Sequence, residues 1–86
     1  LKSPRIADLL RLDDAAFREI FAGSPIKRIG RGRMVRNAAI AAGNSGDPAL
    51  MASLAPLLDD ADEAVRDAAG WALARLKAAS PPQPFR

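Results

Sequence analysis

Apolar residues recur along this chain at the spacing of an α-helix. The clearest stripe consists of Leu50, Leu54, Leu57 and Leu58, at positions i, i+4, i+7 and i+8 of one segment. A second stripe consists of Val65, Ala69, Ala72, Leu73 and Leu76. The breaks between apolar segments carry residues typical of helix ends, and none carries the turn of a β-hairpin. The pattern therefore predicts an all-α fold of five to six helices.

Serine–proline pairs and aspartates mark the predicted helix starts. These positions are Ser3–Pro4, Asp13, Ser24–Pro25, Asp47–Pro48 and Asp62. The helix that starts after Asp13 should present Phe17, Ile20 and Phe21 as its apolar face. It should stop at Gly23, because glycine readily ends a helix.

Glycine and proline also indicate where the later helices end or bend. A helix from about Gly32 to Ala42 is predicted to close at Gly43 and Asn44. Pro56 should distort its segment, because proline lacks the backbone N–H of a regular helix. Gly70 should weaken the last helix by roughly 1 kcal/mol relative to alanine.

Two segments, MVRNAAIAAGN and VRDAAGWALAR, resemble each other at an offset of 31 residues. This offset places Met34 opposite Val65 and Ala38 opposite Ala69. The unit of two helices joined by an acidic turn resembles HEAT-like repeats, in which stacked helix pairs bury each other's apolar faces. We therefore expect residues 1–78 to form one HEAT-like, right-handed stack and the proline-rich residues 79–86 to be disordered.

The charges are unevenly distributed. Residues 24–46 contain five bases and no acid, whereas residues 47–69 contain six acids and one base, within a chain of net charge +3. The five bases, which we call the basic cluster, are Lys27, Arg28, Arg31, Arg33 and Arg36. Cations at helical spacing repel one another unless an anion lies opposite. The planar guanidinium matches phosphate oxygens, so a nucleic-acid backbone is one candidate anion.

A structural role for the basic cluster also stays open. Its side chains would then form a solvated face or pair with the acidic residues 47–67. Within the phosphate-binding hypothesis, Arg31 and Arg33 are the first candidates, followed by Lys27 and Arg28. Arg36 suits a structural role best, because it lies deepest in its predicted helix.

Several other residues have both a functional and a structural interpretation. The acids Asp59, Asp60, Asp62 and Glu63 lack the spacing of a calcium-binding loop, and Asp62 suits a helix cap. Arg66 is expected to tie neighbouring repeats together through carboxylates. Trp71 could stack on a nucleobase, but its alanine-rich context favours burial or half-burial against another domain.

The composition restricts the chemistry. The chain has no cysteine, histidine or tyrosine, so disulfides and thiolate metal sites are excluded. Acid–base catalysis would depend on carboxylates, lysine or arginine, and we expect no catalytic, cofactor-binding or metal-binding residue. No apolar run approaches the roughly 20 residues of a membrane span, and the start LKSPR has neither a signal-peptide pattern nor an initiator methionine. These features predict a piece of a longer, soluble, cytoplasmic protein without membrane contact.

A more specific resemblance runs from about Leu9 to Leu76. The helix LLRLDDAAFR, the segments GSPIKRIGR and RNAAIAAGNSGDP, and one HEAT-like pair together resemble the C-terminal region of epoxyqueuosine reductases. These enzymes perform the last step of queuosine synthesis in bacterial tRNA. The diagnostic part is SPIKRIGR followed by RNAAIAAGNSGDP.

The resemblance implies that this chain does not perform the reduction itself. In that family a cobalamin-binding domain and a ferredoxin-like module with two 4Fe–4S clusters lie upstream. The HEAT-like part packs behind them and helps to hold the tRNA anticodon stem-loop. The chain would then be the tRNA-facing module of its enzyme, with the residues from Lys27 to Arg36 contacting anticodon-stem phosphates.

Two other functions remain open from the sequence. A protein–protein adaptor, a common use of helical repeats, would bind through a concave groove, and charge reversal at Arg31 and Arg33 would leave its binding unchanged. A stand-alone DNA- or RNA-binding protein would be a complete chain with useful affinity in isolation.

Overall fold

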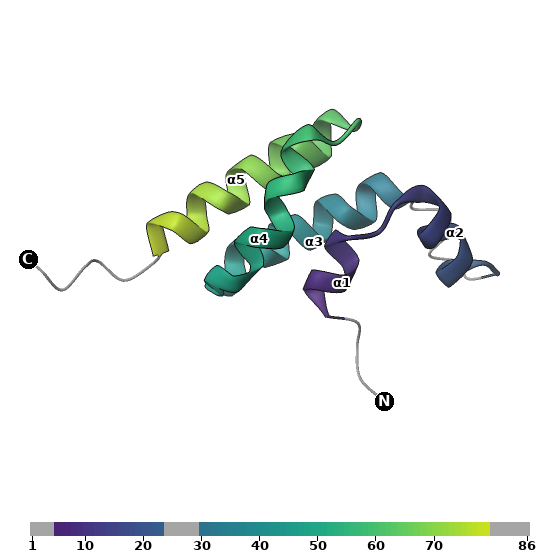
Figure 1. Ribbon diagram of the computed structural model, residues 1–86, viewed down its shortest axis with the longest axis horizontal. Helices are drawn as coiled ribbons and strands as arrows, with labels where there is room; N and C mark the ends of the chain where they lie inside the picture. Colours follow the sequence, from purple (N-terminus) through teal and green to yellow (C-terminus); the bar gives the residue numbers. More distant parts are fainter. Residues whose placement is uncertain (1–4, 24–29, 80–86) are drawn as a thin grey trace, which may run out of the picture.

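The two longest helices, α3 (Arg31–Ser45) and α5 (Glu63–Ala79), lie side by side in the computed structural model (Figure 1). The structure describes residues 5–23 and 30–79. The two helices run in the same direction. Arg36 and Ala64, from the first halves of the two helices, border one hollow, and Asn44 and Arg75, from their second halves, border another. This pair forms one layer of the fold.

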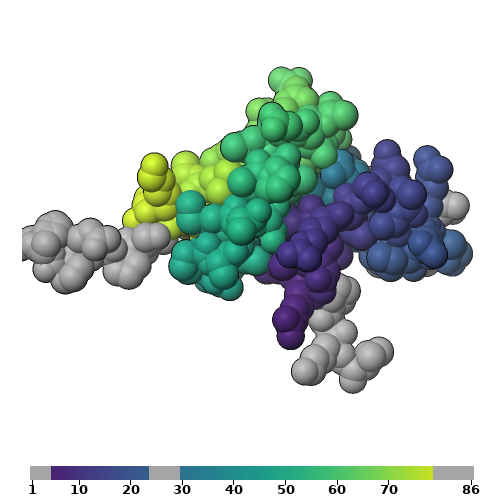
Figure 2. Space-filling model, in the orientation of Figure 1, coloured from purple at the N-terminus to yellow at the C-terminus, as the bar shows by residue number. Residues whose placement is uncertain are grey.

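Shorter helical segments form a second layer against one face of this pair. They are α1 (Ile6–Leu10) and a broken segment made of the 3₁₀ turn η2 (Pro48–Leu50), α4 (Met51–Leu54) and the 3₁₀ turn η3 (Ala55–Asp59). A further helix, α2 (Asp14–Phe21), projects to one side of both layers (Figures 1 and 2). The described residues contain five α-helices and no strand, so the all-α prediction is confirmed.

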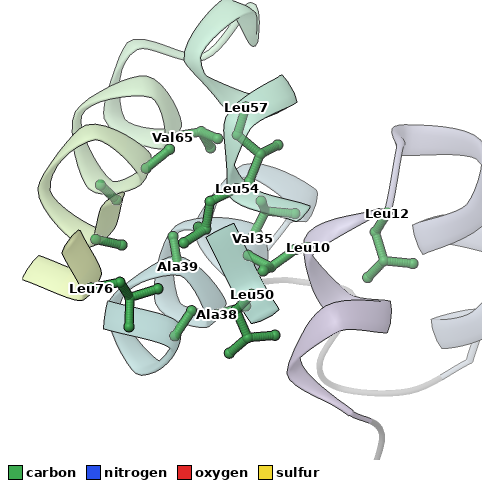
Figure 3. Close-up of a cluster of buried hydrophobic side chains, with 14 of the residues drawn as sticks. Leu10, Leu12, Val35, Ala38, Ala39, Leu50, Leu54, Leu57, Val65 and Leu76 are labelled. Atoms are coloured by element: carbon green, nitrogen blue, oxygen red, sulfur yellow. The ribbon is translucent and has the colours of Figure 1, made fainter. Parts of the chain in front are cut away.

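The core lies between the two layers and is built from aliphatic side chains. Leu54 and Leu57 of the broken segment and Leu10 of α1 gather around Val35 and Val65 of the long helices (Figure 3). The side chains of Leu54, Val35 and Val65 have no exposed surface. Burying each such side chain contributes about 1.5–3 kcal/mol, so this cluster holds the two layers together.

Aspartate side chains cap three helical segments, as predicted. The carboxylates of Asp13, Asp47 and Asp62 each accept a hydrogen bond from a backbone N–H of the following turn, at N···O distances of 2.7, 3.0 and 2.8 Å. The predicted starts at Ser3–Pro4 and Ser24–Pro25 lie outside the described residues.

The end of α3 differs from its prediction. The helix continues through Gly43 and Asn44 to Ser45, and Gly46 follows it with φ of 74°, a left-handed conformation that favours glycine. The prediction was wrong because several residues near this end suit a helix stop and only Gly46 adopts the required backbone. Pro56 does distort its segment, which changes from an α-helix into the 3₁₀ turn η3.

The buried faces of α3 and α5 correspond at an offset of 30 residues, not 31. The buried residues of α3 are Val35, Ala38, Ala39 and Ala42, and their counterparts Val65, Ala68, Ala69 and Ala72 are buried on α5. The predicted offset instead pairs Ala41, which is exposed, with the buried Ala72. One residue of slip rotates a helical side chain by about 100°, so burial distinguishes the two offsets. Whether the two helix pairs stack as HEAT-like repeats stays an expectation.

The long helices approach each other closely at Gly43. A Cβ atom at this position would lie 2.7 Å from Cζ3 of Trp71 and 3.0 Å from Cα of Ala72, both shorter than ordinary contact. Six alanines, at positions 38, 39, 42, 68, 69 and 72, lie on the buried faces of these two helices, and we call this set the alanine seam. Short side chains along this seam let the two backbones come together.

The helix α2 buries only part of its predicted apolar face. Phe17 is buried and its ring centroid lies 5.0 Å from that of Phe21. Ile20 is 62% exposed, so the expectation that it belongs to the packed face was wrong. Because α2 projects from the two layers and contacts α3 only slightly, its side at Ile20 stays in solvent.

Candidate nucleic-acid interface

Arg31, at the first turn of α3, is held by two protein groups through three hydrogen bonds. Its Nη1 and Nη2 atoms donate to the two carboxylate oxygens of Asp60 at 2.9 and 2.7 Å. Its Nε donates to the backbone carbonyl of Leu12 at 2.7 Å. The Arg31 and Asp60 side chains are only 15% and 11% exposed. One guanidinium thus joins the α1–α2 connection to the turn before α5.

The ion pair between Arg31 and Asp60 shifts the pKa of both groups. The hydrogen bond from Arg31 is the main cause that holds the pKa of Asp60 below its ordinary value of 3.8, against the opposing effect of burial. The same hydrogen bond raises the pKa of Arg31. The contact matches the alternative left open by the sequence, in which an arginine of the basic cluster pairs with the acidic 47–67 stretch. Phosphate binding by Arg31 stays an untested prediction.

Arg33 and Arg36 lie one turn apart on α3 and form no ion pair with a carboxylate of residues 5–23 or 30–79. Arg33 is exposed and Arg36 is partly buried. Arg36 makes one long hydrogen bond, 3.5 Å from Nη1 to the side-chain oxygen of Asn37. These two guanidinium groups keep most of their donors for a ligand or water.

Both arginines border an open hollow of about 360 Å³ between the starts of α3 and α5. The residues that line this arginine hollow are Gly32, Arg33, Arg36, Asp62 and Ala64. The carboxylate of Asp62 lies against Gly32, where a Cβ atom would collide with it. The side of the hollow near Gly32 is therefore acidic, and an anion would have to sit toward Arg33 and Arg36.

The remaining members of the basic cluster, Lys27 and Arg28, lie outside the described residues. Arg31, Arg33 and Arg36 follow one another along the first two turns of α3. Yet Arg31 is tied into the fold while Arg33 and Arg36 are available at the surface, so the described part of the cluster divides into two roles.

Arg66 on α5 has a structural contact. Its Nη1 donates to the backbone carbonyl of Asp60 at 2.7 Å, and the Asp60 carboxylate accepts from the backbone N–H of Asp62 at 2.9 Å. This contact is local to the turn before α5 and uses a carbonyl oxygen, so it is not the expected tie between neighbouring repeats through a carboxylate. Asp60 serves as the common partner of Arg31 and Arg66.

Trp71 is half-buried, with 45% of its surface exposed. The guanidinium of Arg75, one turn further along, lies 5.5 Å from the centroid of the ring, within range of a cation–π interaction. The sequence analysis did not connect these two residues, although their i, i+4 spacing on one helix is the signal that would have done so.

Among the described residues, no group of acids is arranged to hold a metal ion. The same residues include no helix that is long and apolar enough to cross a membrane. Asp13, Asp47 and Asp62 act as helix caps, and Asp60 is the ion-pair partner of Arg31.

Comparison with known proteins identifies three similar sequences, all named epoxyqueuosine reductase. The protein of Alicycliphilus denitrificans is 40% identical over 83 residues, which cover 87% of this chain and 23% of the relative. The protein of Xanthomonas campestris is 38% identical over 81% of this chain and 20% of its own length. That of Shewanella oneidensis is 36% identical over 91% of this chain and 21% of its own length.

No protein-family model and no solved structure matches the chain. The chain spans between 20% and 23% of the length of the curated relatives that it matches. At 36–40% identity over most of its own length, it is related in sequence to one segment of the epoxyqueuosine reductases.

Proposed function

We propose that this chain is the tRNA-facing C-terminal module of an epoxyqueuosine reductase, an oxidoreductase that converts epoxyqueuosine to queuosine in tRNA. Its role is to help position the anticodon stem-loop by contacts to phosphate groups. The observation that carries the proposal is the 40% identity to such an enzyme over 87% of the chain. The enzyme as a whole would act in the cytoplasm.

The arrangement of α3 supports phosphate contacts by two arginines in particular. Arg33 and Arg36 stand one turn apart beside the arginine hollow and have no carboxylate partner among the described residues. A phosphate oxygen can accept charge-assisted hydrogen bonds from guanidinium groups placed in this way. Contacts of this kind fix the position of a nucleic acid without reading its sequence.

Arg31 would contribute indirectly. Its bonds to Asp60 and Leu12 fix the first turn of α3 against both connecting loops. The carboxylate of Asp60 also neutralises the charge of Arg31, so we assign the direct phosphate contacts to Arg33 and Arg36 first. Lys27 and Arg28, which precede α3 in the sequence, would add to the same positive surface.

The reduction itself would take place elsewhere in the enzyme. The resemblance implies cobalamin and two 4Fe–4S clusters, and the chain contains none of the cysteines that such clusters require. We therefore place the cofactors in upstream cobalamin-binding and ferredoxin-like domains of the same polypeptide. This module would pack against those domains while it holds the RNA.

Charge reversal tests the proposal. Arg33→Glu and Arg36→Glu should each weaken binding of a tRNA anticodon stem-loop by about tenfold or more, because a hydrogen bond to a charged group contributes about 1.5–3 kcal/mol. Lys77→Glu is the matched control, since Lys77 is exposed near the far end of α5 and undergoes the same change of charge. Affinities would be measured with fluorescently labelled RNA at fixed salt concentration.

The same experiment separates the proposal from a protein–protein adaptor. If all three variants change RNA affinity equally, the loss reflects net charge alone and the assignment to Arg33 and Arg36 fails. If none of them binds RNA less tightly than the unmodified chain, the adaptor is the better explanation.

A further inference from the structure

Residues of α3 and α5 line a second open pocket, which shares Arg36 with the arginine hollow. Its lining residues are Arg36, Ile40, Ala64, Asp67, Ala68 and Trp71, and its volume is about 390 Å³. The volume falls in the range of small-ligand sites. Because its walls are mostly apolar and one of them is an indole ring, we call it the Trp71 pocket.

The position of Arg75 leaves one side of the Trp71 ring facing the pocket. The pocket walls on α5 come from Ala64, Asp67 and Ala68, which precede Trp71 by one and two turns. The guanidinium of Arg75 approaches the ring from the turn that follows, and it does not line the pocket. A flat ligand in the pocket would therefore contact Trp71 without displacing Arg75.

The backbone beneath the ring restricts how far Trp71 can move. Its Cζ3 atom is so close to Gly43 that a Cβ atom there would lie only 2.7 Å away. The ring is thus supported by α3 on its buried edge and by Arg75 at one face, while 45% of its surface stays exposed. A ring held in this way loses little further conformational freedom when a ligand stacks on it.

The charged groups around the pocket favour a nucleotide over an apolar peptide. Arg36 lines both the Trp71 pocket and the arginine hollow, so a phosphate held at Arg33 and Arg36 would be next to the pocket. Asp67 repels phosphate from the pocket itself, but its carboxylate can accept a hydrogen bond from the amino or imino group of a base. Aromatic stacking beside a positive groove is the usual arrangement for single-stranded RNA.

We propose that the Trp71 pocket binds an unpaired nucleobase of an RNA loop, which stacks on Trp71 while the adjacent phosphate contacts Arg33 and Arg36. The inference rests on the proposed RNA-binding function and adds a base-binding site to it. Stacking on an aromatic side chain does not distinguish one base from another. Any preference would come from Asp67, whose carboxylate favours bases with a free N–H donor.

The fluorescence of Trp71 gives a direct test. Trp71 is the sole tryptophan and the chain has no tyrosine, so selectively excited emission reports this one ring. The full chain would be titrated with an anticodon stem-loop RNA, and affinity would be measured separately with labelled RNA. We expect saturable quenching, and we expect Trp71→Leu to weaken binding about 5- to 150-fold, the range for one base–aromatic stack.

Two control variants separate stacking from a general effect on folding. Trp71→Phe keeps an aromatic face and should retain most of the affinity that Trp71→Leu loses. Leu58→Ala removes an apolar side chain that is 45% exposed, as Trp71 is, and that does not line the pocket, so it should leave affinity unchanged. If Trp71→Leu is poorly folded by circular dichroism, the comparison of Trp71→Phe with the unmodified chain and the quenching itself decide the test.

The outcomes distinguish this inference from the proposed function. If RNA binds and Arg33→Glu weakens it, but Trp71 emission is unchanged and Trp71→Leu binds normally, the base site is refuted and the phosphate contacts stand. If RNA quenches Trp71 and Arg33→Glu has no effect, the base site stands and the assigned phosphate contacts fall. If RNA at high concentration neither binds nor quenches, the base site is refuted.

Discussion

Two glycines within the long helices differ in the space available for a side chain. Gly70 lies on α5, and a Cβ atom there would meet only Cδ2 of Leu58, at an ordinary 3.8 Å. Gly43 lies on α3, and its Cβ atom would meet Trp71 and the backbone of Ala72. The sequence marks both as poor helix formers, but only the packing shows that one of them is required.

Gly70→Ala should stabilise the protein by about 1 kcal/mol. Alanine loses less conformational entropy in a helix than glycine, and the structure leaves room for its methyl group. The free energy of unfolding would be measured by urea denaturation followed by circular dichroism at 222 nm, a wavelength that reports helix content. No change, or a loss of stability, would contradict the space seen at Leu58.

Gly43→Ala should have the opposite sign. The added methyl group must push the Trp71 ring and the Ala72 backbone apart, and overpacking of this kind costs about 1–3 kcal/mol, which exceeds the gain in helix propensity. The same denaturation experiment gives the answer. Because the two variants make an identical chemical change within helices, their difference measures packing alone.

At the scale of elements, the Arg31 side chain joins three segments: α3, the α1–α2 connection and the turn before α5. Arg31→Ala should destabilise the fold by about 2 kcal/mol, because it leaves Asp60 and the Leu12 carbonyl without their donor. Arg33→Ala, two residues further along α3, should change stability by less than about 0.5 kcal/mol, since Arg33 is exposed. Thermal or urea denaturation of both variants checks this, and equal effects would refute the structural role of Arg31.

The Asp60 carboxylate should make stability depend on pH in the acid range. Its pKa in the folded state lies below its ordinary value of 3.8, so on acidification the unfolded chain takes up a proton before the folded chain does. The contribution of the ion pair is therefore complete above pH 3.8 and is lost as the pH falls through the folded pKa. Asp60→Asn should remove this part of the dependence in denaturation curves recorded between about pH 2 and 6. If Asp60→Asn loses stability at acid pH as steeply as the unmodified protein does, the lowered pKa of Asp60 is contradicted.

Local patterns predicted the elements better than the contacts between them. The aspartate caps and the effect of Pro56 were correct because each depends on neighbours within a few residues. The offset between the long helices and the exposure of Ile20 were wrong because they depend on which face another element covers. The different roles of Arg31 and Arg33 could not be predicted for the same reason. The partner that ties Arg31 into the fold, Asp60, lies 29 residues away in sequence.

At the scale of the whole molecule, the uneven charge predicts a strong effect of salt on RNA binding. The logarithm of the association constant should fall by about 0.7–0.9 per unit of log salt concentration for each phosphate neutralised. The double variant Arg33→Ala, Arg36→Ala should lower this slope by about that amount for each contact removed. Filter-binding measurements across a salt series provide the slopes, and a slope unaffected by the double variant would place the phosphate contacts elsewhere.

The candidate interface could be predicted only in part. The sequence located a group of positive charges around the start of α3, because the absence of acids from residues 24–46 is visible without a structure. It could not show that Trp71 would lie beside Arg36, since the two meet only when α3 and α5 pack in the same direction. Lys27 and Arg28 remain predictions.

The alanine seam has a consequence for how this sequence can vary. At an ordinary core position such as Leu54, a smaller residue leaves a cavity, so small replacements are destabilising there. Along the seam the limit is reversed: glycine or serine fits between the two backbones, whereas leucine or phenylalanine would force them apart. A library that places every amino acid at each position should therefore retain small residues at Gly43 and Ala72, where the two helices meet closely, and large ones at Leu54. At these positions selection would therefore favour residues that keep the two helices close together. The amount of apolar area that each residue buries would matter less.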